Sequence, residues 1–282
     1  MTAIPTTAPG PGPRATVRPA ADLLHEARAR ERAACIPEAI AGYQAAIAAA
    51  EGGGRGEQAV LAEALRRLAV VRHRCNQSAE ARELCGRSQS AAREAGNDLL
   101  AAEALNTLGG IELEAGALPE ARKHFLRAVQ LGGPSRELRA RVEQNLGILA
   151  SIQGDFDEAL ACYQRSLEAY TSCNDEHGCA IAYHNLGMAS VDRGEFDHAE
   201  QSFRQSSEIA ERAGDAHLQG MCLVNHAVVH IARERYEEAR RNAEAALAIF
   251  DQLGARSDKA EAYRVIGMVY RDTGRPALAE SR

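Results

Sequence analysis

One arrangement of small and large apolar residues recurs along the chain from Ala20 to its last residue. Its clearest copies begin at Asn106, Asn145 and Asn185, where a Leu precedes a small residue that we call the anchor. Twelve residues after every anchor comes an Ala. Small residues at both positions let two antiparallel helices approach until their backbones nearly touch, so each copy predicts a helical hairpin. The anchors recur about every 40 residues, at Ala27, Ala69, Gly109, Gly147, Gly187, Ala227 and Gly267.

Two further positions of each copy support the hairpin. Sixteen residues after the anchor lies a residue that we call the filler and expect to plug the space beside the next hairpin. The fillers are Tyr43, Cys85, Phe125, Tyr163, Phe203 and Ala243. A Gly marks the turn between the two helices in several copies, since Gly adopts a positive φ at no steric cost. These turn residues are Gly116, Gly154, Gly194 and Gly274.

This pattern resembles the tetratricopeptide repeat, on the strength of Leu146-Gly147 with Ala159 and Tyr163, and of the matching residues in the neighbouring copies, Leu108-Gly109, Leu186-Gly187, Ala199 and Phe203. The longer period is similar to that of kinesin light chains, spindle-orientation adaptors and the sensor regions of maltose-activator-like bacterial regulators. The resemblance implies an all-α, right-handed α-solenoid of about seven antiparallel helix pairs over residues 20–282, with the last repeat incomplete. In such a stack the first helices line the concave face.

Composition agrees with an all-α chain and narrows the partners. Aromatic residues make up only 4% of the sequence and Trp is absent, so bulk must come from aliphatic residues. A net charge of −6 disfavours nucleic acid as a partner. The sequence has no long apolar run and no secretion signal, and its seven Cys lack a regular spacing, so we expect a cytoplasmic protein without disulfides.

The first 19 residues are rich in Pro and polar residues, which predicts a disordered arm. It is either a docking tail that carries Arg14 and Arg18 or a plain solvated terminus. At the other end, the second helix of the last repeat stops at Arg282 after little more than a turn. Three explanations are open. The chain is part of a longer protein, another subunit covers Ile266, Val269 and Tyr270, or the end frays.

The candidate binding site follows from one position on the first helices. Two residues before the anchor stands Asn145, Asn185 or Asn225 in three consecutive copies, and Thr107 in the copy before. Asn is a mediocre helix former, so its repetition needs a reason. Either the carboxamides grip the backbone of an extended peptide, or each one hydrogen-bonds to the neighbouring hairpin and supports the stack. In peptide-binding proteins that this pattern resembles, the equivalent Asn contacts the ligand.

Other residues should flank these amides on the groove. Met and aliphatic side chains would form adaptable pockets, and the arginines would meet carboxylates. The flanking residues are Arg141, Gln144, Ile148, Ser151, His184, Met188, Val191, Met221, Val228 and Arg264. For the aliphatic members, packing between repeats is the alternative. The two-carboxylate clamp of chaperone-binding relatives is absent, which disfavours a C-terminal EEVD-type ligand.

Three clusters contain residue types that are found in metal, catalytic or phosphate sites, but none of them has the complete motif. Cys173, His177 and Cys179 lack paired Cys-x2-Cys ligands and fit a connecting loop. His226 and His230, with His217 upstream, lack the Glu of a metallohydrolase motif and fit structural roles. The Gly-rich segment 52–56 lacks the Lys-Ser/Thr of a phosphate loop. We therefore predict no active site, no metal and no cofactor.

These observations favour an adaptor that binds a protein or peptide segment on its concave face. A second hypothesis is a ligand-sensing regulatory module of a larger signalling or transcription-regulator protein. A third is an assembly subunit that forms a homo-oligomer through its C-terminal repeat.

Overall fold

The computed structural model describes residues 18–275, and within this range all regular structure is α-helical. The thirteen helices follow the predicted repeats, which confirms the all-α fold class and its consecutive helix pairs. They are α1 (Ala20–Arg32), α2 (Ile36–Ala50), α3 (Arg55–Arg74), α4 (Ser78–Glu94), α5 (Asp98–Glu114), α6 (Leu118–Leu131), α7 (Arg136–Gln153), α8 (Phe156–Ser172), α9 (Glu176–Asp192), α10 (Phe196–Ala213), α11 (Ala216–Ala232), α12 (Tyr236–Leu253) and α13 (Arg256–Asp272).

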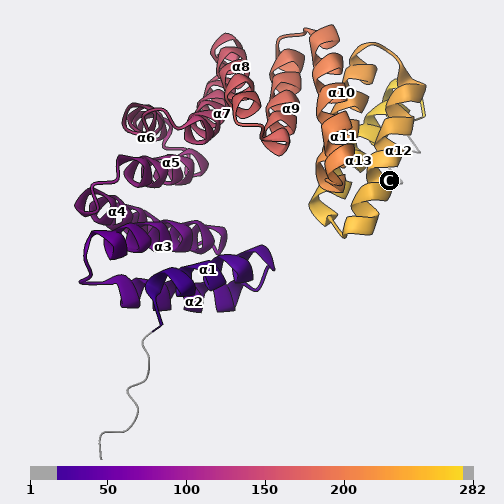
Figure 1. Ribbon diagram of the computed structural model, residues 1–282. Coiled ribbons are helices and arrows are strands. Elements are labelled where there is room, and N and C mark those ends of the chain that lie inside the picture. Colours follow the sequence, from indigo (N-terminus) through magenta and orange to yellow (C-terminus); the bar gives the residue numbers. More distant parts are fainter. Residues whose placement is uncertain (1–17, 276–282) are drawn as a thin grey trace, which may run out of the picture. The chain divides into compact units, whose positions relative to one another are not determined.

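The chain divides into two compact units, residues 1–111 and 112–282. In the first unit α1 packs against α2 and α3 against α4 (Figure 1). In the second unit the hairpins are α7 with α8, α9 with α10, and α11 with α12, and α13 follows them. The second helix of a hairpin also contacts the first helix of the next one, as α2 does with α3, α8 with α9, α10 with α11 and α12 with α13, so these hairpins stack within each unit. In the described part, no helix has the length and apolar character that a membrane span requires.

The turns between paired helices use one backbone conformation. Gly154 and Gly194 have φ values of 78° and 77°, and Gly116 and Gly274 are similarly positive, as predicted. The same turn position is occupied by non-Gly residues in other hairpins, and Ala34, with φ 56°, and Glu234, with φ 58°, adopt the same conformation. These two residues therefore sit in a left-handed region that costs an ordinary L-residue about 1 kcal/mol or more.

Inside a hairpin, the anchor faces the filler ring. A Cβ atom on Gly147 would lie 2.5 Å from Cε1 of Tyr163, and one on Gly187 would lie 2.5 Å from Cε1 of Phe203. The expectation that the anchors bring two backbones together was therefore wrong at these positions, because an aromatic ring occupies the space. Where the filler is as small as Ala243, the anchor is an Ala, Ala227. In these three hairpins the sizes of anchor and filler vary together, whereas the first hairpin combines the anchor Ala27 with the fully buried filler Tyr43.

The fillers also reach the next hairpin, as predicted. Tyr163 of α8 lies in a buried cluster with Ala189 of α9. Phe203 of α10 is fully buried and packs with Val229 of α11, its ring centroid 5.7 Å from that of His226. One ring therefore fills the interior of its own hairpin and the junction with the following one.

A buried serine joins the two helices of three hairpins. Ser88, Ser166 and Ser206 each donate a hydrogen bond from Oγ to a backbone carbonyl of the preceding first helix, at 2.7, 2.8 and 2.8 Å. All three residues are fully buried. A hydroxyl so placed has no access to water, so this hydrogen bond is required if the side chain is to be buried without penalty.

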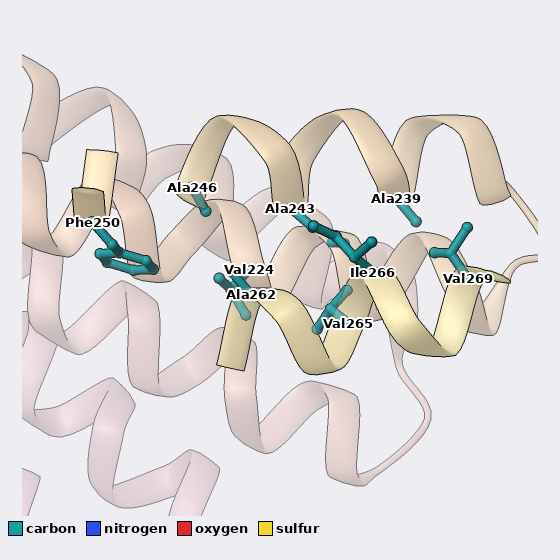
Figure 2. Packing of buried hydrophobic residues seen from close by; sticks show 10 residues of the cluster. Val224, Ala239, Ala243, Ala246, Phe250, Ala262, Val265, Ile266 and Val269 are labelled. Carbon is teal, nitrogen blue, oxygen red and sulfur yellow. The ribbon is translucent and has the colours of Figure 1, made fainter. Parts of the chain in front are cut away.

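The last described helix is covered by its neighbours. Figure 2 shows Ile266 and Val269 of α13 packed among Ala239 and Ala243 of α12, and both apolar side chains are buried. Tyr270 is partly buried against the same cluster. Ile266 and Val269 consequently need no second subunit to cover them, contrary to one of the explanations offered above. The second helix of this repeat lies outside the described residues.

At the other end, helix α1 begins at Ala20, directly after Pro19, where the repeats were expected to start. Residues 1–17 of the predicted arm, including Arg14, lie outside the described residues.

Candidate functional site

The first helices of successive hairpins form an inner row. In the second unit α7 contacts α9, α9 contacts α11, and α11 contacts α13, and in the first unit α1 contacts α3. The second helices α8, α10 and α12 make no such contact with one another in the described structure. Helices on the inner side of a curved stack are the ones that come together, so this pattern supports the assignment of the concave side to the first helices.

Local sequence fixes where three helices of the second unit begin. Asp155, Asp175 and Asp215 stand at the N-caps of α8, α9 and α11, and each accepts a hydrogen bond from a backbone N–H three residues further on, at 2.8–3.0 Å. Such caps satisfy amides that have no partner inside the helix, and each is worth about 1 kcal/mol. They set the register in which α9 and α11 present their side chains.

The three asparagines occupy equivalent places on α7, α9 and α11, and all three are half-buried. Asn145 already has an interaction within the protein. The carboxamide of Asn185 makes no hydrogen bond with any other residue between 18 and 275. Asn225 has its Nδ2 atom 3.4 Å from Nε2 of His184 on the preceding first helix. The three asparagines therefore differ: Asn145 and Asn225 already have partners within the protein, whereas the carboxamide of Asn185 has none among the described residues.

Asn225 belongs to a chain of hydrogen bonds that crosses three helices. The Nδ1 atom of His184 lies 3.6 Å from Sγ of Cys222, and this thiol donates to Oγ of Ser206 at 3.2 Å. Ser206 in turn donates to the carbonyl of Ala180. If Asn225 donates to Nε2 of a neutral His184, Nδ1 of His184 donates to the sulfur of Cys222. The three inner members, His184, Cys222 and Ser206, then each accept one hydrogen bond and donate one.

Burial supports that protonation state. His184 is 7% exposed, and desolvation lowers its pKa to about 4, so the imidazole is neutral at pH 7. Burial likewise raises the pKa of Cys222 to about 11, so the thiol keeps its proton. His184 was predicted to line the groove; the structure places it inside the stack, where it supports Asn225.

Several other predicted groove residues are held by their own hairpin. Gln144 accepts a hydrogen bond from Oη of Tyr170 at 3.1 Å, and Ser151 lies 3.3 Å from Oη of Tyr163. Arg141 donates to the carbonyl of Glu137 on its own helix and has a further interaction.

The aliphatic members divide between packing and exposure. Ile148, Val191 and Val228 pack beside buried clusters, as the alternative interpretation expected. Met188 is 40% exposed, the largest apolar exposure among the predicted site residues.

At the end of the row, Met221 and Asn225 of α11 line a small cavity of about 90 Å³ with Asp258 and Glu261 of α13. Arg264 is paired with Glu261 at 2.5 Å. Thr107 lies on α5 in the first unit and donates to the carbonyl of Glu103 within its own helix.

The Cys and His clusters considered above as metal or catalytic sites lie in places where they have structural roles. Cys173 ends α8 and Asp175 caps α9, so that segment is a connection between hairpins. The Nε2 atom of His226 lies 3.0 Å from the carbonyl oxygen of Glu200, and the His226 ring is tilted by 44° to that of His230, with the ring centroids 6.0 Å apart. Within residues 18–275, no three His, Cys, Asp or Glu side chains are grouped to hold a metal ion.

The prediction overlooked a group of arginines on the first two inner-row helices. Arg28 and Arg32 of α1 and Arg67 and Arg74 of α3 line one cavity of about 350 Å³. The available signal was the register: Arg67 stands two residues before its anchor, the position that Asn occupies in later repeats.

Comparison with known proteins agrees with the repeat pattern. The tetratricopeptide repeat family model matches residues 60–132, 138–212 and 219–282. No curated protein sequence matches.

Solved structures share the fold at low identity. A STAND signal-transduction ATPase with a tetratricopeptide repeat sensor, from Pyrococcus horikoshii, superposes with a TM-score of 0.74 at 13% identity, over 93% of this chain and 40% of that one. The apo form of RapI gives 0.62 at 15% identity, over 90% and 98% of the two chains. A Rap protein complexed with Competence and Sporulation Factor gives 0.64 at 15% identity, over 92% and 76%.

Tetratricopeptide repeats are generally non-catalytic modules for protein–protein interaction. The three matched stretches together include most of the sequence and coincide with the helix pairs described above. The chain therefore belongs to the tetratricopeptide repeat family.

Proposed function

We propose that the protein is an adaptor that binds an extended peptide segment of a partner protein along the inner row α7–α9–α11. The observation that carries the proposal is the half-buried carboxamide of Asn185, which lies at the centre of this row and has no hydrogen-bond partner among residues 18–275. A carboxamide offers both a donor and an acceptor, which matches the alternating N–H and C=O groups of a peptide backbone.

The surroundings of Asn185 support the same role. Met188 is exposed one turn further along α9, and an unbranched thioether side chain adapts to different apolar partners. Asn225 uses its Nδ2 on His184, which leaves its carboxamide oxygen to accept a hydrogen bond from a ligand. The hydrogen-bond chain behind it keeps the row rigid, so little conformational entropy is lost on binding. A Rap protein of the same fold has been solved with a bound factor.

The test is selection of binding peptides from a random display library, followed by titration of a fluorescent selected peptide. We expect Asn185→Ala to weaken binding about tenfold, because two hydrogen bonds to the peptide are lost. Its thermal stability should stay the same or rise slightly, since no internal hydrogen bond is removed and Ala is the better helix former.

Asn242→Ala is the matched control. Asn242 is also half-buried and its carboxamide makes no hydrogen bond with the described residues, but it lies on α12, a second helix. Its replacement should leave peptide affinity unchanged. Equal affinities of the two variants, or a large loss of stability with unchanged binding in Asn185→Ala, would contradict the proposal.

A ligand-sensing role within a larger regulator is the second candidate. It is supported by the likeness to the STAND ATPase with a repeat sensor, of which this chain spans 40%. A sensor would bind a small effector, so selection with peptides would fail while a metabolite mixture raised the melting temperature. In either role we place the protein in the cytoplasm, where its seven free cysteines would stay reduced.

A further inference from the structure

The inner row of the first unit differs in chemistry from that of the second. Where α7, α9 and α11 present amides and aliphatic side chains, α1 and α3 present guanidinium groups. Arg28, Arg32, Arg67 and Arg74 surround a cavity of about 350 Å³, and Glu31 is the only carboxylate that lines it in the described structure.

Two carboxylates pair with three of the four arginines. Glu63 pairs with Arg28 at 3.1 Å and with Arg67 at 3.8 Å, and Glu31 pairs with Arg74 at 3.6 Å. The carboxylates are the deeper groups: the Glu31 side chain is 12% exposed, whereas that of Arg74 is 67% exposed. Glu31 is engaged further, because it accepts a hydrogen bond from Oη of Tyr43.

The cavity consequently has more positive charge than its own carboxylates neutralise. Four guanidinium groups stand against Glu31 and Glu63, and Arg32 has no ion-pair partner among residues 18–275. Each guanidinium has five N–H donors in a planar fork, and a single carboxylate contact uses at most two of them. The arginines are the more exposed partners of these pairs, since the Arg28 side chain is 39% exposed and that of Glu63 is 25% exposed. Donors that the carboxylates leave unused are therefore accessible to a ligand.

We propose that this arginine cavity of α1 and α3 binds an acidic segment of a partner protein through the carboxylates of its Asp or Glu side chains. Charge complementarity identifies the partner: the chain as a whole carries a net charge of −6, which repels an acidic segment, whereas this cavity sets four guanidinium groups against two carboxylates and attracts one. The arginine cavity lies in the first unit, so its occupancy is independent of the carboxamide row proposed above, and either site can fail alone.

The experiment measures fluorescence anisotropy of labelled hexaglutamate with the full chain, at low and at physiological salt. Hexaglutamine is the uncharged probe, and a peptide with phosphoserines in a Gly-Ser background tests phosphate. We expect hexaglutamate to bind, hexaglutamine not to bind, and the affinity to fall as salt rises.

The variant Arg32→Gln/Arg74→Gln removes two exposed guanidiniums without unpairing Glu63. It should weaken hexaglutamate binding about five- to tenfold, because each exposed charge pair is worth a few-fold in affinity. The control Arg93→Gln/Arg212→Gln makes the same change in net charge on the second helices α4 and α10 and should bind as the parent does.

Three results would overturn the proposal. They are no hexaglutamate binding at low salt, equal weakening by the two double variants, and binding of the phosphoserine peptide without binding of hexaglutamate. The circular dichroism spectra of both variants establish that they are folded.

Discussion

The size match between anchor and filler makes a quantitative prediction at Gly187. In Gly187→Ala the new methyl group would stand 2.5 Å from Cε1, 2.7 Å from Cδ1 and 2.8 Å from Cζ of Phe203. Carbon atoms in contact prefer separations of about 3.5–4.0 Å, so the ring would have to move by about 1 Å. It cannot do so freely, because Phe203 is fully buried between His184 and His226, with ring centroids 5.7 Å away on both sides.

The expected loss of stability is about 1 kcal/mol. Overpacking of a close-packed core typically costs about 1–3 kcal/mol, and exchange of Gly for Ala in a helix returns up to about 1 kcal/mol. Phe203→Ala alone should cost about 3–5 kcal/mol through the cavity that it leaves. In that background Gly187→Ala should cost nothing or stabilise, because the double variant reproduces the pair Ala227 and Ala243 of a sister hairpin.

The assay is urea unfolding followed by circular dichroism at 222 nm for the parent, both single variants and the double variant. Gly86→Ala is the control: Gly86 lies within α4 and its added Cβ would meet nothing within 4 Å, so this change should stabilise by about 1 kcal/mol. A difference of about 2 kcal/mol between the effects of Gly187→Ala in the two backgrounds is expected, because only the overpacking cost differs between them. Equal effects in both backgrounds would refute the reasoning, as would a Gly187→Ala variant as stable as Gly86→Ala.

Three further outcomes follow from the packing. Glu234→Gly should stabilise by about 1 kcal/mol in thermal unfolding, because it relieves a left-handed φ of 58° on an exposed side chain; a loss would mean that Glu234 makes an unrecognised contact. Ser166→Ala should cost about 1 kcal/mol in urea, because a buried hydrogen bond is lost where sister repeats tolerate Ala. The lowered pKa of His184, about 4, means that the unfolded chain binds a proton between pH 6.5 and 4 that the folded chain does not, so stability falls as pH drops through that window. His184→Gln should reduce this slope, and an unchanged pH profile would exclude His184 as its source.

The helix pairs were predictable because their signals are local in the sequence. The recurrence of anchors, the Gly turns and the Ala twelve residues on are visible without coordinates, and helix α1 begins at the predicted Ala20. The turn at Glu234 was not predicted, because a Glu residue does not indicate a positive φ. Only its register, seven residues after Ala227, indicates the turn.

The site was less predictable because it depends on which neighbours a side chain finds. Asn145, Asn185 and Asn225 look identical in sequence, yet only Asn185 is uncommitted, since the preceding first helix carries a His that Asn225 reaches. The arginine cavity was missed for a related reason. Four arginines spread over two helices look like a solvated surface until α1 and α3 are placed in contact.

The match of anchor and filler has a consequence for how such a chain grows. Because both members of the pair lie in one hairpin, duplication of a whole repeat copies a ready-made interior along with the segment. A newly copied hairpin would thus already contain an anchor and a filler that fit one another, and its exposed inner-row residues would be free to diverge. The contrast between the arginines of the first unit and the amides of the second is the kind of difference that this freedom allows.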